Sequence, residues 1–263
     1  MARETKPELD RKAYRILIGC GIFIVGLISL YAWASSSIVK LDPESLCPKG
    51  RPIVDHTIIL IDRTDPIPEH IVETIFREIN GIKEYLPKYA LLSIYQINSE
   101  SAEIMAPEFC LCNPGNGDDE SFLYKNPAQI HARWEKQFGQ PLSEALDAMR
   151  EVARSETSPI FEAIGVVGDL PGFRDATGRR QLVIYSDMLQ NMRWCNHYNG
   201  GRYEVSIDEI RRVMPDLHGA DIEIRYIERS STAAIQGPAH QQHWQETLRQ
   251  LGAGRVTVRR IVG

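Results

Sequence analysis

The chain has 263 residues, of which 43% are hydrophobic and 25% are charged, a composition typical of a globular protein. Its formal net charge is −5 and it has no long basic run, which argues against nucleic acid as a partner. A domain of roughly 200 residues buries about 70% of the surface of its unfolded chain, so a single core is expected to stabilise it.

An uncharged, largely apolar segment runs from residue 16 to residue 39. A helix of this length spans about 36 Å, which exceeds the roughly 30 Å hydrocarbon core of a bilayer. Tyr14 lies before the segment and Tyr31 and Trp33 lie near its end, where aromatic rings favour the membrane interface. The segment therefore predicts one transmembrane helix at residues 16–39 in contact with the lipid bilayer.

The charges that flank this segment predict its orientation. Residues 1–15 carry five basic side chains, whereas residues 40–52 carry three, mixed with acidic ones. Since basic residues favour the cytoplasmic side, we expect residues 1–15 in the cytoplasm and the C-terminal domain on the periplasmic or extracellular side of the inner (cytoplasmic) membrane. The alternative is a signal peptide that is cleaved after Ala34, because Ala32-Trp33-Ala34 matches a cleavage pattern.

The rest of the chain reads as a linker at residues 40–52, rich in proline and glycine, followed by one domain at residues 53–263. Apolar and β-branched runs predict strands at residues 56–61, 89–98, 103–111, 181–186, 222–227 and 256–261. Helical spacing and helix-start signals predict helices at residues 71–85, 127–138, 141–155, 158–169, 206–214 and 238–251, with a break at Gly139 and Pro141.

The alternation of strands and helices predicts the fold class. We expect an α/β fold with a doubly wound, mostly parallel sheet and helices on both faces. The third strand follows the second after a short connection, so it is expected to be antiparallel, and Pro107 places it at an edge. In such sheets, ligands bind at the carboxyl ends of the strands, near the point where the strand order reverses.

The cysteines suggest a disulfide framework. Cys20 lies in the apolar segment, and the other four are Cys47, Cys110, Cys112 and Cys195. An even number in an exported domain predicts disulfides. Cys110 and Cys112 are too close in sequence to pair with each other comfortably, so each is a candidate partner of Cys47 or Cys195. Buried free thiols, or a metal site that includes His197, are the alternatives.

Four oxygen-bearing residues are expected to meet at the carboxyl edge of the sheet. Asp62 and Asp187 each follow a predicted strand, Thr64 lies two residues after Asp62, and Ser158 starts a predicted helix. Carboxylate and hydroxyl oxygens suit Mg²⁺, with water completing the coordination shell. The alternative is that these residues only cap helices or shape loops, and that Ser158 is an N-cap.

This pattern resembles the metal-ion-dependent adhesion site of von Willebrand factor type A (vWA) domains, over about residues 53–262. Asp62 and Thr64 match the start of the family's D-x-S-x-S sequence, Ser158 stands where the family has a threonine, and Asp187 matches its last aspartate. The resemblance implies a Rossmann-like fold, bound Mg²⁺ and a protein partner. Pro66 departs from the pattern, since it replaces the second serine and has no side-chain oxygen.

The sequence favours a binding module over an enzyme, because it has no nucleophile elbow, P-loop or H-E-x-x-H sequence. Trp194 and Tyr198 are expected to lie in a packed loop near Asp187, and a partner surface framed by these two residues is the alternative. His240 and His243 share a helix face that is expected to be exposed, and a shared metal is the alternative. The expected function is a membrane-anchored vWA-like module that binds another protein. A structural subunit of an envelope complex with a vestigial site is the alternative, followed by a hydrolase.

Overall fold

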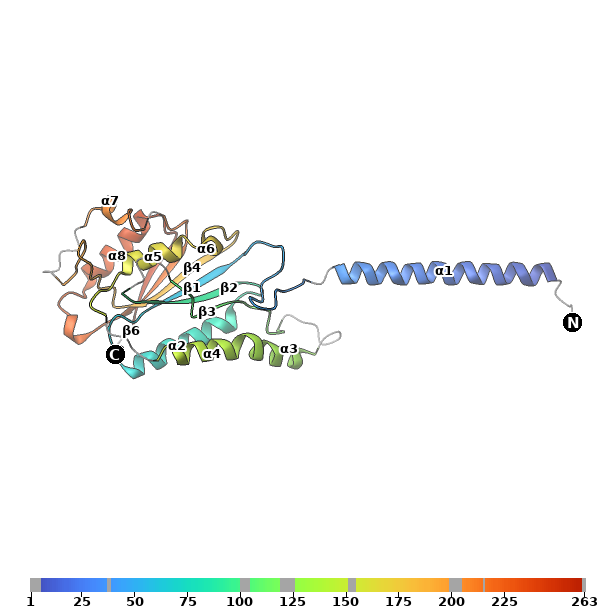
Figure 1. The fold of residues 1–263 in the computed structure, drawn as a ribbon, viewed down its shortest axis with the longest axis horizontal. Coiled ribbons are helices and arrows are strands. Elements are labelled where there is room, and N and C mark those ends of the chain that lie inside the picture. The colour runs from blue at the N-terminus through green and yellow to red at the C-terminus, as the bar shows by residue number, and fades with distance from the viewer. Residues whose placement is uncertain are drawn as a thin grey trace. The chain divides into compact units, whose positions relative to one another are not determined.

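The computed structural model describes residues 6–36, 39–99, 105–118, 126–150, 155–198, 205–214 and 216–261. It divides into two compact units, Met1–Lys40 and Leu41–Gly263 (Figure 1). The residues from Leu41 onward, which include most of the predicted linker, therefore belong to the same unit as the sheet.

The first unit contains one helix, α1 (Lys6–Ser36). It starts earlier than the predicted segment and ends before residue 39. Its stretch Ala13–Tyr31 has a mean hydropathy of 2.1 over 19 residues. Among the described residues, this is the one helix that is long and apolar enough to cross a membrane. Large apolar side chains such as Ile22, Phe23 and Leu30 are exposed along it, as expected for a helix that meets lipid or a partner.

The second unit is built on a six-stranded sheet with the order β3-β2-β1-β4-β5-β6. Its strands are β1 (His56–Asp62), β2 (Leu91–Ile97), β3 (Phe109–Cys112), β4 (Arg180–Ser186), β5 (Asp221–Ile227) and β6 (Val256–Ile261). All neighbours pair in parallel except β2 and β3. The predicted fold class, with one antiparallel edge strand, is confirmed.

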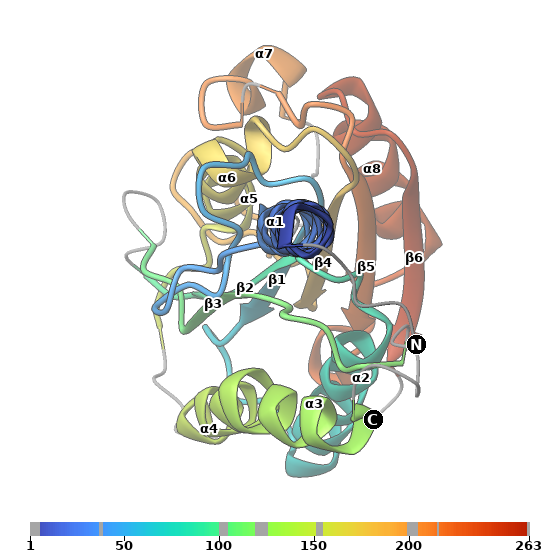
Figure 2. The same cartoon turned by 90° about the vertical axis from the view of Figure 1, so that its right-hand side faces the viewer.

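Helices cover both faces of the sheet (Figures 1 and 2). On one face lie α2 (Glu69–Tyr85), α3 (Pro127–Trp134), the π-helical segment η1 (Glu135–Gly139) and α4 (Gln140–Ala148). On the other lie α5 (Ile160–Gly168), α6 (Pro171–Arg174), α7 (Ile207–Ile210) and α8 (Pro238–Gln250), and a short 3-10 turn, η2 (Ser230–Thr232), precedes α8. Every residue of β1 is buried, because this strand is central and carries apolar side chains toward both layers.

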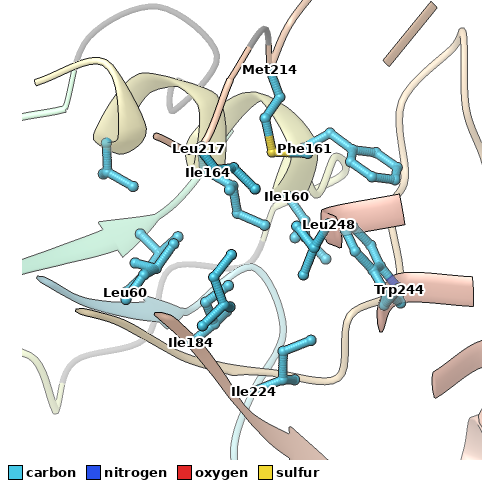
Figure 3. Close-up of a cluster of buried hydrophobic side chains, with 14 of the residues drawn as sticks. Leu60, Ile160, Phe161, Ile164, Ile184, Met214, Leu217, Ile224, Trp244 and Leu248 are labelled. Atoms are coloured by element: carbon cyan, nitrogen blue, oxygen red, sulfur yellow. The ribbon is translucent and has the colours of Figure 1, made fainter. Parts of the chain in front are cut away.

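The core between the sheet and α5 and α8 holds the carboxyl edge in place (Figure 3). Phe161 of α5 and Trp244 of α8 stack with ring centroids 4.3 Å apart. The Trp244 indole N–H also donates to the carbonyl oxygen of Met188, at 2.9 Å. Because Met188 directly follows Asp187, this hydrogen bond ties the loop after β4 to the core.

Several predicted element boundaries were wrong, and the helix predicted to reach residue 155 ends at Ala148. The helix does not break at Gly139, because the N–H of Gln140 donates to Glu135 five residues earlier, and this wider π turn accommodates Pro141, which has no N–H. The third strand begins at Phe109, after Pro107, rather than at residue 103, and residues 103 and 104 lie outside the described residues. The helix predicted at 206–214 is only one turn long, although its Ser206–Glu209 capping box is present.

One disulfide joins Cys47 to Cys112, whose Cα atoms are 4.9 Å apart. Cys110 and Cys195 are free thiols, so the disulfides predicted for these two residues are wrong. Cys110 is exposed on the edge strand β3. Cys195 is buried in the core, and burial raises the pKa of its thiol to about 12, which makes it unreactive.

The disulfide fixes the start of the second unit to one end of the sheet. Cys112 also donates its backbone N–H to the carbonyl oxygen of Ser45, and Leu41 bridges to Pro48. Cys112 pairs with Leu91, the first residue of β2. The segment that follows Lys40 is therefore attached at the edge where the parallel strands begin.

The two glycines of α5 give a matched stability test. A Cβ at Gly165 would overlap the carbonyl oxygen of Val213, whereas a Cβ at Gly168 would meet Leu217 at an ordinary 3.6 Å. We expect Gly165→Ala to lower the free energy of unfolding by about 2 kcal/mol or more, because backbone atoms must move. Gly168→Ala is expected to be neutral or stabilising. Urea unfolding of both variants checks this, and equal effects would contradict the close packing of α5.

Candidate functional site

The loops that follow β1 and β4 meet at the carboxyl edge of the sheet. β1 and β4 are adjacent and parallel, and they flank the point where the strand order reverses. Asp62 is the last residue of β1 and Asp187 directly follows β4. The structure brings Asp62, Thr64, Ser158 and Asp187 together at this edge, as the sequence led us to expect.

Asp62 is buried, and each oxygen of its carboxylate accepts at least one hydrogen bond. Its Oδ1 accepts from the backbone N–H of Thr64 at 3.0 Å and from the Thr64 hydroxyl at 2.7 Å. Its Oδ2 accepts from the hydroxyl of Ser186 at 2.7 Å. These bonds fix the turn after β1, so Asp62 does not cap α2, which begins at Glu69.

Ser158 reaches the same cluster from the loop before α5. Its hydroxyl oxygen lies 3.2 Å from that of Thr64. The single Thr64 hydroxyl proton is directed to the Asp62 carboxylate, which is the stronger acceptor, so the Ser158 proton remains available to Thr64 or to a ligand. The N-cap residue of α5 is Pro159, with no side-chain cap. The alternative in which Ser158 serves as a helix cap is therefore wrong.

Asp187 forms an ion pair with an arginine that the sequence analysis did not select. Its Oδ2 accepts from Nε of Arg229 at 2.6 Å, and its Oδ1 accepts from the N–H of Leu189 at 2.9 Å. Nη1 of Arg229 donates to the carbonyl oxygen of Pro66 at 2.7 Å. Arg229 thus connects the loops after β1, β4 and β5.

The backbone of Arg229 is held equally firmly. Its N–H donates to Oε1 of Gln236 at 2.9 Å, and Nε2 of Gln236 donates to the carbonyl oxygens of Asp187 and Ile227. Gln236 is itself buried. Arg229 follows the end of β5 by two residues. The sequence analysis searched the ends of the predicted strands for aspartate only, and a search that included arginine would have selected Arg229.

The charges at this edge influence one another. Burial and the neighbouring Asp62 carboxylate raise the pKa of Asp187, while the Arg229 guanidinium opposes this effect. Burial and the nearby charge of Asp187 also raise the pKa of the Tyr198 hydroxyl. Tyr198 therefore stays neutral and is available as a hydrogen-bond donor at neutral pH.

The oxygen atoms that would ligate a metal do not fit a divalent cation in this arrangement. Both carboxylates already accept hydrogen bonds at each oxygen, and a guanidinium with a fixed positive charge lies against Asp187. Pro66 supplies no side-chain oxygen and its carbonyl is bound to Arg229. Across the described part of the chain, no group of three or more His, Cys, Asp or Glu residues is arranged to hold a metal.

A cavity of about 440 Å³ lies beside this cluster. Its walls are mostly polar and rich in hydroxyl groups, and the lining residues are Thr64, Asp65, Ser155, Thr157, Ser158, Asn191, Tyr198, Arg229, Ser231 and Thr232. Tyr198 is 39% exposed at the rim. Tyr198 therefore lines this cavity, whereas Trp194 donates its indole N–H to Glu162 at 2.7 Å.

The predicted pair of histidines on α8 is not an exposed pair, because His240 lies in the core and only His243 is partly exposed. His240 is fully buried, and its Nδ1 lies 2.6 Å from the hydroxyl of Tyr226. Its Nε2 lies 3.1 Å from Nδ1 of His197, which is also fully buried. These histidines support the loop that carries Tyr198, and they do not reach the cavity.

Together, the strand order, the two strand-end aspartates and the cavity define a doubly wound α/β protein with a polar cavity at the carboxyl edge of its sheet. No protein-family model and no curated protein matches the sequence. Among the solved structures with a similar fold, three each align with 80% of this chain. One is a von Willebrand factor type A protein from Catenulispora acidiphila, with 11% identity, a TM-score of 0.47 and 39% of its own length covered.

The other two are the VWA domain of SpRpn10 and the pilus adhesin SpaC from Lactobacillus rhamnosus GG. SpRpn10 shows 11% identity, a TM-score of 0.43 and 89% coverage of its length. SpaC shows 10% identity, a TM-score of 0.42 and 28% coverage of its length. The fold class of this chain rests on its own strand order and pairing, which are described above.

Proposed function

We propose that the chain is a membrane-anchored protein-binding module of the vWA type, which engages a partner protein through the cavity at the carboxyl edge of its sheet. The observation that carries this proposal is the convergence of the loops after β1, β4 and β5, with Ser158, around one open polar cavity. A site built from several separate loops on a rigid sheet is typical of recognition surfaces.

The chemistry of the cavity favours binding over catalysis. The hydroxyl of Ser186 is fully buried and donates to Asp62, so it is not available as a nucleophile. Ser158 lies beside Thr64, and within the described residues it has no imidazole partner that would activate it. Neither of these two serines therefore supports the hydrolase alternative.

The anchor and the compartment belong to the same proposal. The length and hydropathy of α1 are consistent with a single membrane span. The disulfide between Cys47 and Cys112 favours an oxidising compartment, which supports a domain on the periplasmic or extracellular side. The alternative, a structural subunit of an envelope complex, would use the same anchor without the cavity.

Site-specific photo-crosslinking in cell membranes tests the proposal. A photoreactive amino acid in place of Tyr198, at the cavity rim, is expected to capture a defined partner. The same substitution at Tyr85, which is 90% exposed at the end of α2 and thus at the opposite edge of the sheet, is the matched control. Ser231→Arg, which adds bulk to the cavity wall, is expected to abolish capture at position 198.

Capture at both tyrosine positions, unaffected by Ser231→Arg, would favour the scaffold alternative. The crosslinking is done in cells whose growth requires the protein, so that the variants are known to be functional. Absence of capture at both positions would then contradict binding through this edge.

A further inference from the structure

We infer that Arg229 is the built-in cation of this site and that its guanidinium keeps divalent cations out. Arg229 lines the cavity through which we propose that a partner binds. The exclusion of metal ions does not depend on that proposed function, whereas the expected effect on partner binding rests on it. Where the resemblance to vWA domains implies a metal ion between Asp62 and Asp187, this chain supplies a positive charge of its own.

The contacts of Arg229 place its positive charge directly against Asp187 and against the loop that follows β1. Nε lies 2.6 Å from Oδ2 of Asp187, and Nη1 lies 2.7 Å from the carbonyl oxygen of Pro66. The Asp187 side chain is only 4% exposed and that of Arg229 is 18% exposed. In such a buried pair the attraction is weakly screened, and an arginine cannot lose its charge to make room for another cation.

Two features of position 66 bear on the replacement of a metal ion by Arg229. Proline removes the side-chain oxygen that the family pattern has there, and its carbonyl becomes an acceptor for Arg229. The hydrogen bond joins residues 163 positions apart. Its acceptor is a backbone carbonyl, which any residue at position 66 would carry, so the missing side-chain oxygen is the effect that belongs to proline itself.

One nitrogen of Arg229 remains for a ligand. Nη2 makes no hydrogen bond to any residue in the described ranges, and Arg229 lines the cavity. The cavity therefore presents an arginine N–H donor together with the hydroxyls of Ser158 and Tyr198. A partner could bind this N–H group where, in a metal-dependent site, it would coordinate the metal ion. Binding at this edge is expected to persist when divalent cations are removed.

Divalent titration of the full chain in mild detergent tests the inference, with the midpoint of thermal unfolding (Tm) as the readout. Protein treated with EDTA is titrated with Mg²⁺ and then Mn²⁺. The wild-type Tm is expected to stay constant. Arg229→Gln removes the charge and leaves Asp62 and Asp187 uncompensated, so its Tm is expected to rise with either ion, and Arg229→Gln/Asp187→Asn is expected to lose this response.

Pro66→Ser provides a second, independent variant, because Pro66 is exposed and the change restores the family's hydroxyl. If Arg229 excludes the ion, Pro66→Ser alone is expected to show no response, and Pro66→Ser/Arg229→Gln is expected to respond. Arg229→Lys keeps a cation at the site and is expected to behave as the wild type.

A wild-type Tm that rises with Mg²⁺ and depends on Asp187 would overturn the inference, and so would a response of Pro66→Ser alone. A folded Arg229→Gln protein without any response would also overturn it. The photo-crosslinking at Tyr198, carried out with and without EDTA, separates the two failures. Absence of capture under both conditions would contradict the proposed function and leave the titration results unchanged, whereas capture that is lost only in EDTA would contradict the inference.

Discussion

Replacing Cys47 or Cys112 with serine is expected to lower the free energy of unfolding by about 4 kcal/mol. The two cysteines are 65 residues apart, and a crosslink that closes a loop of this size removes considerable entropy from the unfolded chain, worth about 4 kcal/mol at 25 °C in the chain-entropy description. Urea unfolding of the full chain in mild detergent, with and without reductant, measures the difference.

Cys110→Ser is the control for this prediction. Cys110 lies two residues from Cys112 on the same strand, but it is a free and exposed thiol. Its replacement is expected to change the free energy of unfolding by less than about 0.5 kcal/mol. If Cys47→Ser and Cys110→Ser unfold at the same urea concentration, then the disulfide does not form in the native protein.

Acidification from pH 6.5 to pH 4 is expected to destabilise the domain steeply. Burial lowers the pKa of His56 and of His240 to about 4, and burial together with His240 and His243 lowers the pKa of His197 to about 3. Unfolding exposes these imidazoles, whose pKa then returns to about 6.5, so the unfolded chain binds more protons throughout this window. The histidine contribution to stability is therefore complete above pH 6.5 and declines as the pH falls toward 4.

The expected size of this loss is considerable. A pKa that falls from 6.5 to about 4 corresponds to about 3 kcal/mol for a single histidine at pH 4. His240→Gln is expected to reduce the slope of unfolding free energy against pH by about one proton, and replacement of the exposed His70 serves as the control. A stability that stays constant between pH 6.5 and pH 4 would contradict the neutral, buried state of these histidines.

The fold and part of the site follow from local sequence features. Asp62 and Asp187 could be selected because each ends a run of buried residues, and parallel strands align such ends at one edge. The Ser206–Glu209 capping box is likewise a local pattern, and it is present. Thr64 follows Asp62 by two residues, so its place in the site is also set by local geometry.

The remaining features depend on contacts between distant segments. Arg229 meets Pro66 and Asp187 only because β5 lies beside β4 in the folded sheet. Its position just after a strand indicates the carboxyl edge of the sheet, but it does not indicate these two partners. The pairing of Cys47 with Cys112 requires the segment before β1 to pack against β3. The π turn before Pro141 depends on a hydrogen-bond shift that residue propensities do not encode.

The attachment of the segment Leu41–Gly50 has a mechanical consequence. It is fixed at the edge where the parallel strands begin, and the cavity opens at the edge where they end. A tension between the N-terminal segment and a molecule held at the cavity would act along the strands, loading many interstrand hydrogen bonds at once in shear rather than one after another. Because the Cys47–Cys112 bond divides this load between the starts of β1 and β2 and the end of β3, the sheet is arranged to resist pulling as a unit.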